Sequence, residues 1–177
     1  MHPELARRFE RVERHKRDLL EGVAGRDDAW LNRAPVPGAW SIVQVIAHLV
    51  LSEAGTLSYI GKKIQAPPEE IPRAGPMAVL RSLALTAALR SPLRRQAPER
   101  ARPASEPEPL DSVRGRWDEV RAGWRERLET YPEALHGRAI FRHPFAGRFS
   151  MAQTLGFLDE HLLHHARQIE RFKSLLG

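Results

Sequence analysis

The sequence predicts an all-α fold, and three observations lead to this class. Apolar residues recur at the three- and four-residue spacing of a helix face in five separate segments. A serine and a glutamine stand three residues apart at the start of two of these segments, which is the spacing of a helix capping box. Only residues 139–149, with their irregularly spaced phenylalanines, favour extended or hairpin-like structure.

Start and stop signals delimit the five expected helices. Pro3 suits the first turn of a helix, and Ser41 can cap the start of the second one. Pro67 and Pro68 end the second helix, and Pro132 ends the fourth, because proline cannot continue a helix. The expected ranges, in chain order, are 3–22, 41–65, 76–89, 110–131 and 150–176.

The third and fourth helices are joined by residues 91–109, "SPLRRQAPERARPASEPEP", which are rich in proline and charge and poor in apolar residues. We interpret this segment as an exposed, mobile connection. The helices on either side of it cannot bury their apolar faces alone, so residues 1–177 are interpreted as a single helical domain. A chain of 177 residues is long enough for one core and too short for two typical domains.

Composition and charge narrow the classes of function. The chain contains no cysteine, which excludes disulfides, thiolate metal ligands and a cysteine nucleophile. Its net charge of +6 invites a nucleic-acid interpretation, but the arginines alternate with acids or lie in 90–103, so a solvated basic surface explains them. The charged N-terminus is not a secretory signal, and no uninterrupted apolar run reaches the ~20 residues of a membrane span. We therefore expect a cytoplasmic protein with no membrane or nucleic-acid partner.

One internal similarity links two of the expected helices. The stretches "GAWSIVQVIAHL" (38–49) and "GRFSMAQTLGFL" (147–158) share a glycine, an aromatic residue, a capping serine and a glutamine at the same spacing. Two capped entries to buried helices explain this similarity. A bundle with pseudo-two-fold symmetry, in which these helices have matching roles, explains it as well.

The stretch "HLLHHARQ" near the end of the chain places polar side chains on an apolar helix face. At about 100° per residue, His161, His165 and Gln168 lie on the apolar stripe of the last helix. His164 lies on the flank of the stripe, and Asp159 is expected on the outer surface. Two buried imidazoles one turn apart need partners, which a divalent metal ion or ordinary hydrogen bonds can provide.

The helix at 41–65 offers possible partners for these histidines. Glu53 lies near the middle of its apolar stripe and His48 lies at one edge. If this helix faces the last one, His48, His161 and His165 could supply three nitrogens to one ion, with Glu53 and Gln168 orienting them or ligating occasionally. Alternatively, His48 is a boundary residue that touches solvent, and Glu53 pairs with an arginine of the first or fourth helix.

The remaining histidines and the tryptophans have simpler interpretations. His143 either approaches the site from its loop or caps a turn, and we favour the cap. His2, His15 and His136 are interpreted as surface residues. The tryptophans, expected as core or helix-entry aromatics, are Trp30, Trp40, Trp117 and Trp124.

Together, "PGAWSIVQVIAHL" and "HPFAGRFSMAQTLGFLDEHLLHHARQI" resemble the DinB/YfiT-like superfamily of bacterial proteins. The resemblance covers most of the chain, apart from 91–109. It implies a four-helix bundle with up-down-down-up topology, additional short helix and loop segments, and a homodimeric assembly. It also implies a zinc or nickel site with His48, His161 and His165 as ligands, His164 as the non-ligating middle histidine and Gln168 as the glutamine of the C-terminal motif.

The same resemblance implies a divalent-metal-dependent enzyme. Members of the superfamily include transferases that use low-molecular-weight thiols such as bacillithiol, mycothiol or glutathione, and some hydrolase- or isomerase-like proteins. Three protein nitrogens leave coordination positions open, as in catalytic sites. We therefore expect a thiol S-transferase that acts on a small-molecule substrate. The alternatives are hydrolysis by metal-activated water and a non-catalytic dimeric bundle or ligand-binding module.

Overall fold

The computed structural model describes residues 1–91 and 99–177 of the chain. The five expected helices are present, with ends within about two residues of the predicted ones. A four-residue helix, one of the additional short segments that the resemblance implies, follows the first one. The helices are α1 (Pro3–Glu21), α2 (Asp28–Leu31), α3 (Ile42–Lys63), α4 (Pro76–Arg90), α5 (Leu110–Glu129) and α6 (Met151–Leu176), and the strands are β1 (Phe141–His143) and β2 (Gly147–Phe149).

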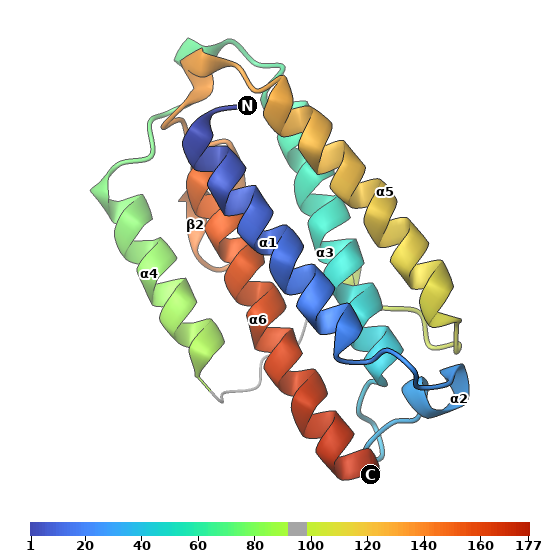
Figure 1. Cartoon of the computed structure of the whole chain (residues 1–177). Helices are drawn as coiled ribbons and strands as arrows, with labels where there is room; N and C mark the ends of the chain where they lie inside the picture. The colour runs from blue at the N-terminus through green and yellow to red at the C-terminus, as the bar shows by residue number, and fades with distance from the viewer. Residues whose placement is uncertain (92–98) are drawn as a thin grey trace.

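Four long helices, α1, α3, α5 and α6, form a bundle (Figure 1). Helices α1 and α6 run side by side in one direction, and α3 and α5 both run in the opposite direction (Figure 1). This is the up-down-down-up topology, and it confirms the predicted fold class. Helix α4 lies outside the bundle and packs on α6, so α6 contacts α1, α3 and α4.

Both predicted capping boxes are present. The Ser41 hydroxyl accepts a hydrogen bond from the backbone N–H of Gln44, and the Gln44 side chain accepts one from the backbone N–H of Ser41. Ser150 and Gln153 repeat this arrangement at the start of α6. The glycine three residues before each serine has a positive φ, +77° in one case and +80° in the other. The two similar stretches of sequence therefore form the same local structure, which lets α3 and α6 begin at defined residues.

The core lies between the four long helices. Trp117 and Trp124 of α5 are fully buried, and Trp30 and Trp40 pack partly buried against the same core, as expected for core and helix-entry aromatics. Helix α3 is long and apolar enough to span a membrane by length and composition alone, which differs from the expectation based on apolar runs. More than half of this stretch is buried inside the bundle, as is usual for a core helix.

The predicted extended segment forms a two-stranded antiparallel hairpin, in which Phe141 pairs with Phe149. His143 is buried at the end of β1, and its Nδ1 accepts hydrogen bonds from the backbone N–H groups of Phe145 (3.2 Å) and Ala146 (3.1 Å). Burial lowers the pKa of His143 to about 4, so the acceptor nitrogen stays unprotonated at neutral pH. His143 therefore caps the turn, which is the interpretation that we favoured.

The structure describes part of the connection at 91–109. Its residues 92–98 lie outside the described residues. From residue 99 onward the chain contacts α3, and the Gln44 side chain donates a hydrogen bond to the Ala104 carbonyl oxygen (2.9 Å). Most side chains in this half are exposed, as expected, and the α3 surface contacts its backbone at Ala104.

Candidate metal centre

Three histidine side chains meet between α3 and α6. His48 comes from α3, and His161 and His165 come from consecutive turns of α6. The Nε2 atom of His161 lies 3.2 Å from Nε2 of His48 and 3.1 Å from Nε2 of His165. One ring nitrogen of each residue lies within 4.8 Å of the others. The structure thus brings together the three histidines that the sequence singled out.

These distances fit a tetrahedral metal ion. Zinc binds imidazole nitrogens at ~2.0–2.1 Å, so two ligands of one tetrahedral ion are ~3.3 Å apart. The two measured Nε2–Nε2 separations, 3.2 Å and 3.1 Å, are close to this value. The spacing therefore needs only small shifts to hold a divalent ion.

In His48 and His165, the hydrogen bond made by Nδ1 determines that Nε2 is the nitrogen that can act as an acceptor toward the middle of the cluster. Nδ1 of His48 lies 2.6 Å from the carbonyl oxygen of Ala101, and Nδ1 of His165 lies 2.7 Å from Oε1 of Gln168. Because these oxygens only accept, each Nδ1 carries the proton and donates it, and each Nε2 keeps its lone pair. Both lone pairs are directed toward Nε2 of His161.

A cation would satisfy the converging nitrogen lone pairs better than the three rings can satisfy one another. A neutral His161 has one ring proton, so it can satisfy at most one of the two facing lone pairs well. Its own Nδ1 is buried and has no hydrogen-bond partner among the described residues. Buried polar atoms are rarely left without partners, so the arrangement fits a bound metal ion.

The site also keeps its histidines in the neutral form that binds metals. Burial lowers the pKa of His48, and it lowers that of His165 to about 3. Burial also holds the pKa of His161 well below its usual range, and charge on the neighbouring histidines would lower it further. At neutral pH no proton has to leave these nitrogens before an ion binds.

Two aromatic side chains border the rings. Phe157 stacks against His161, with ring centroids 5.4 Å apart and planes inclined by 21°. The Trp40 ring lies 5.3 Å from that of His48. These neighbours limit the orientations of the imidazoles and lower the local polarity, which strengthens interactions with a charged ligand.

The other residues of the C-terminal motif occupy separate positions. Gln168 contacts His165 one turn away, as expected for a residue that orients a ligand. His164 points toward α4, where its Nδ1 donates to the carbonyl oxygen of Leu89 (2.6 Å). His164 is not one of the three clustered histidines, which agrees with its expected non-ligating position.

The structure corrects the expectation that Glu53 orients a histidine. Its carboxylate accepts hydrogen bonds from Trp117 Nε1 (3.0 Å) and from the guanidinium of Arg121 (2.8 Å). This is the alternative interpretation, an ion pair with an arginine of the fourth expected helix, which is α5. Glu53 follows His48 by five residues, which turns it by about 140° around α3 and away from the histidines. Burial raises its pKa, and the Arg121 charge opposes this change.

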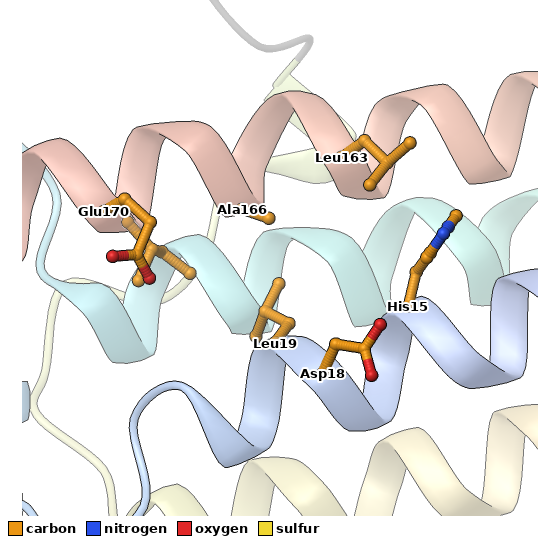
Figure 2. Close-up of a pocket in the computed structure, with 7 residues that line it drawn as sticks. His15, Asp18, Leu19, Leu163, Ala166 and Glu170 are labelled. Atoms are coloured by element: carbon orange, nitrogen blue, oxygen red, sulfur yellow. The ribbon is translucent and has the colours of Figure 1, made fainter.

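Asp159 is a second correction, because it is buried and does not lie on an outer surface. Its carboxylate accepts hydrogen bonds from Arg11 (2.8 Å) and His15 (2.7 Å) of α1, since α6 has neighbours on several sides. His15 is consequently half-buried, as is His136, whereas His2 is exposed as expected. A pocket of about 140 Å³ lies between α1 and α6 and is bordered by His15 and other residues (Figure 2), but by none of the three clustered histidines.

The Ala101 carbonyl is the part of the site that the sequence interpretation missed. It lies in the connection that was expected to be mobile, and it fixes the ring of His48. Every residue has a carbonyl group, so no residue type or spacing marks one that will reach a histidine. Only the path of residues 99–101 past α3 reveals it.

Comparison with known proteins identifies the family of this chain. The model of the DinB superfamily matches residues 11–169, a range that includes all three clustered histidines. The chain belongs to the DinB superfamily. Among curated proteins, no sequence matches this DinB chain.

Two solved structures share the fold of this DinB protein. YfiT from Bacillus subtilis, described as "a probable metal-dependent hydrolase with an unusual four-helix bundle topology", is 17% identical, with a TM-score of 0.64. The match covers 98% of this chain and 89% of YfiT. TT2238, described as a four-helix bundle protein, is 20% identical, with a TM-score of 0.59, and the match covers 94% and 98% of the two chains. At these identities the comparisons show the fold.

Proposed function

We propose that this DinB protein is a divalent-metal-dependent enzyme whose ligands are His48, His161 and His165. The observation that carries the proposal is the convergence of three Nε2 atoms while two of the outer Nδ1 atoms donate to fixed oxygens. An imidazole nitrogen set suits zinc or nickel, which are the ions we expect. Three protein ligands leave room in the coordination sphere for a further ligand, as in catalytic sites.

The reaction that we propose is transfer of an exogenous thiol to a small electrophilic substrate. A bound divalent ion would supply Lewis acidity that lowers the pKa of a coordinated thiol or water. The chain has no cysteine, so the thiol comes from a small molecule of the bacillithiol, mycothiol or glutathione class. The thiol loses its proton to solvent, its sulfur bonds to the electrophile, and the leaving group departs. This chemistry suits the cytoplasm, where such thiols are kept reduced.

The positions of the buried carboxylates favour a thiol over water as the nucleophile. Glu53 and Asp159, buried on the two helices that carry the histidines, are paired with other side chains. Within the described ranges, no acidic residue belongs to the histidine group. A thiol is acidic enough to ionise with modest help, whereas activation of water commonly uses a nearby base. Hydrolysis is the second candidate, supported by the description of YfiT.

Metal analysis of the protein tests the site. After loading with zinc or nickel and removal of excess ion, protein without a histidine tag should hold one ion per chain. We expect His165→Ala to lose this ion and His164→Ala, which changes the preceding residue of the same helix, to keep it. A wild-type chain without stoichiometric metal would support the non-catalytic bundle and overturn the proposal.

Activity measurements then separate the two reactions. Metal-loaded protein is assayed with a panel of thiols and alkylating electrophiles, and in parallel with ester and amide substrates without thiol. Thiol-dependent turnover that is lost in His165→Ala and kept in His164→Ala would support S-transfer. Thiol-independent turnover with the same dependence on His165 would assign hydrolysis.

A further inference from the structure

Residues 101–104, in the connection before α5, lie against α3 and accept hydrogen bonds from two of its side chains. His48 donates from Nδ1 to the carbonyl oxygen of Ala101 (2.6 Å), and Gln44 donates from Nε2 to that of Ala104 (2.9 Å). Gln44 and His48 are four residues apart, so they project from the same face of α3 on consecutive turns. This face binds the connection at two points, and one of them is a residue of the candidate metal centre.

The segment has little apolar surface that could hold it in place. Arg102 and Ala104 are exposed, and Ala101 and Pro103 are half-buried. No described side chain of residues 99–104 belongs to the apolar core. The position of this backbone therefore depends largely on the hydrogen bonds that α3 provides, which makes the segment easy to release.

The carbonyl of Ala101 is available to accept the His48 proton. It ends the 3₁₀ helix η2 (Glu99–Ala101), in which the backbone N–H of Arg102 bonds back to the carbonyl oxygen of Glu99 (3.1 Å). Carbonyl groups at the C-terminal end of a helix lack a partner within that helix. The His48 ring supplies this missing partner.

A metal ion on His48 would strengthen this hydrogen bond. An ion at Nε2 requires the proton on Nδ1, which is the tautomer that donates to Ala101. The charge of the ion also makes this N–H a stronger donor, as in other charge-assisted hydrogen bonds. Because coupling between two binding events is reciprocal, a docked connection favours metal binding at His48 by the same factor.

The second capping box of the chain indicates that Gln44 does more than cap α3. Gln153 caps α6 in the same way, and both glutamines are half-buried. Among the described residues, the Gln153 side chain bonds only within its own capping box, whereas that of Gln44 also reaches Ala104. The bond to the connection is thus an addition to the shared motif, one turn before His48.

We propose that Gln44 is a positioning residue for the metal centre, which holds residues 101–104 on α3 and so keeps the Ala101 carbonyl in place to orient His48. Metal occupancy and docking of this segment are then linked, and the segment becomes less mobile when the ion binds. The inference rests on the metal site of the proposed function and not on its reaction. It makes the mobility expected for the connection depend on metal occupancy.

Competition with a chromophoric chelator for zinc measures the effect on metal affinity. Gln44→Met removes the donor to Ala104 together with the side-chain acceptor of the cap, and Gln153→Met removes only a cap acceptor of the same kind. We expect Gln44→Met to bind zinc about 3- to 10-fold more weakly than the wild type, which is the effect of one hydrogen bond. Gln153→Met should bind zinc as tightly as the wild type.

A spin label beside the docked segment measures the linkage. The chain has no cysteine, so Ser105→Cys, next to Ala104, gives a single exposed site for a nitroxide, and Ser174→Cys near the end of α6 gives an exposed control. Zinc should reduce the mobile fraction of the spectrum at position 105 and leave that at position 174 unchanged. Adding Gln44→Met should increase the mobile fraction at position 105. A side chain that only caps a helix would not change this response to zinc.

Two results would overturn the inference while leaving the metal site intact. One is equal zinc affinity of folded Gln44→Met and Gln153→Met, both at one ion per chain. The other is a spectrum at position 105 that zinc does not change, although the labelled protein holds one ion. This second measurement needs no substitution at Gln44, so it decides the question even if Gln44→Met fails to fold. A wild-type chain that holds no zinc would overturn the inference and the proposed function together.

Discussion

Replacing Arg121 by methionine removes the charge that compensates Glu53 in the bundle core. The side chains are 4% and 1% exposed, and a guanidinium nitrogen lies 2.8 Å from the carboxylate. Methionine fills much of the same volume but leaves the carboxylate buried without its cation. Breaking a buried pair in this way costs about 3–5 kcal/mol of unfolding free energy. The expected loss is a large fraction of the total stability of a domain of this size.

Urea unfolding followed by circular dichroism measures this loss. The matched control is Arg125→Met, which changes an exposed arginine one turn later on α5. Its guanidinium lies over the Phe9 ring, so a change within about 1 kcal/mol is expected. The double variant Glu53→Gln/Arg121→Met removes both charges and keeps an oxygen for Trp117, so it should regain most of the stability.

Two outcomes would refute this reasoning. If Arg121→Met lowers the free energy of unfolding by no more than the Arg125→Met control, the pair is not effectively desolvated. If folded Glu53→Gln protein loses its metal, Glu53 contributes to the histidine site despite its contacts with Arg121 and Trp117. We expect metal stoichiometry to be the same in all of these variants.

Three further predictions concern the site and the hairpin. Gln168→Leu should weaken metal affinity by about 10- to 100-fold in a chelator competition, with Gln168→Glu close to wild type, because His165 loses the acceptor that orients it. His143→Ala should cost about 1–3 kcal/mol in urea unfolding without loss of metal, because the N–H groups of Phe145 and Ala146 lose their acceptor. The third prediction is a pH dependence: burial lowers the pKa of His165 from 6.5 to about 3, so below pH 6.5 the unfolded metal-free chain takes up a proton that the folded chain does not. Its free energy of unfolding should therefore fall as pH decreases from 6.5 toward 3, less steeply in His165→Gln, and equal slopes would contradict the assignment.

Much of the site on α6 could be predicted from local helix geometry. Residues four and three positions apart share a helix face, so His161, His165 and Gln168 had to lie together once the segment was helical. The capping serines likewise define where α3 and α6 begin, because the capping bonds join residues only three apart. These features depend on near neighbours in the chain, and the sequence shows those neighbours directly.

Contacts between distant segments could not be predicted in the same way. The sequence left Glu53 with two interpretations, and only the packing of α5 against α3, which brings Arg121 to the carboxylate, decides between them. Asp159 has the residue type of an outer position, but α1 covers it and supplies Arg11. In both cases the partner lies more than 60 residues away, so its identity depends on how the helices pack.

By itself, the sequence determined the all-α class, the positions of the long helices and the three histidines that belong together. Periodicity and capping are local, and a family motif retains the spacing of its functional residues. Only the tertiary structure decided that the Ala101 carbonyl orients His48, that Glu53 belongs to an ion pair and that α4 leaves Leu80 and Leu83 uncovered. These features arise from the relative placement of segments, which depends on the packing of the whole chain.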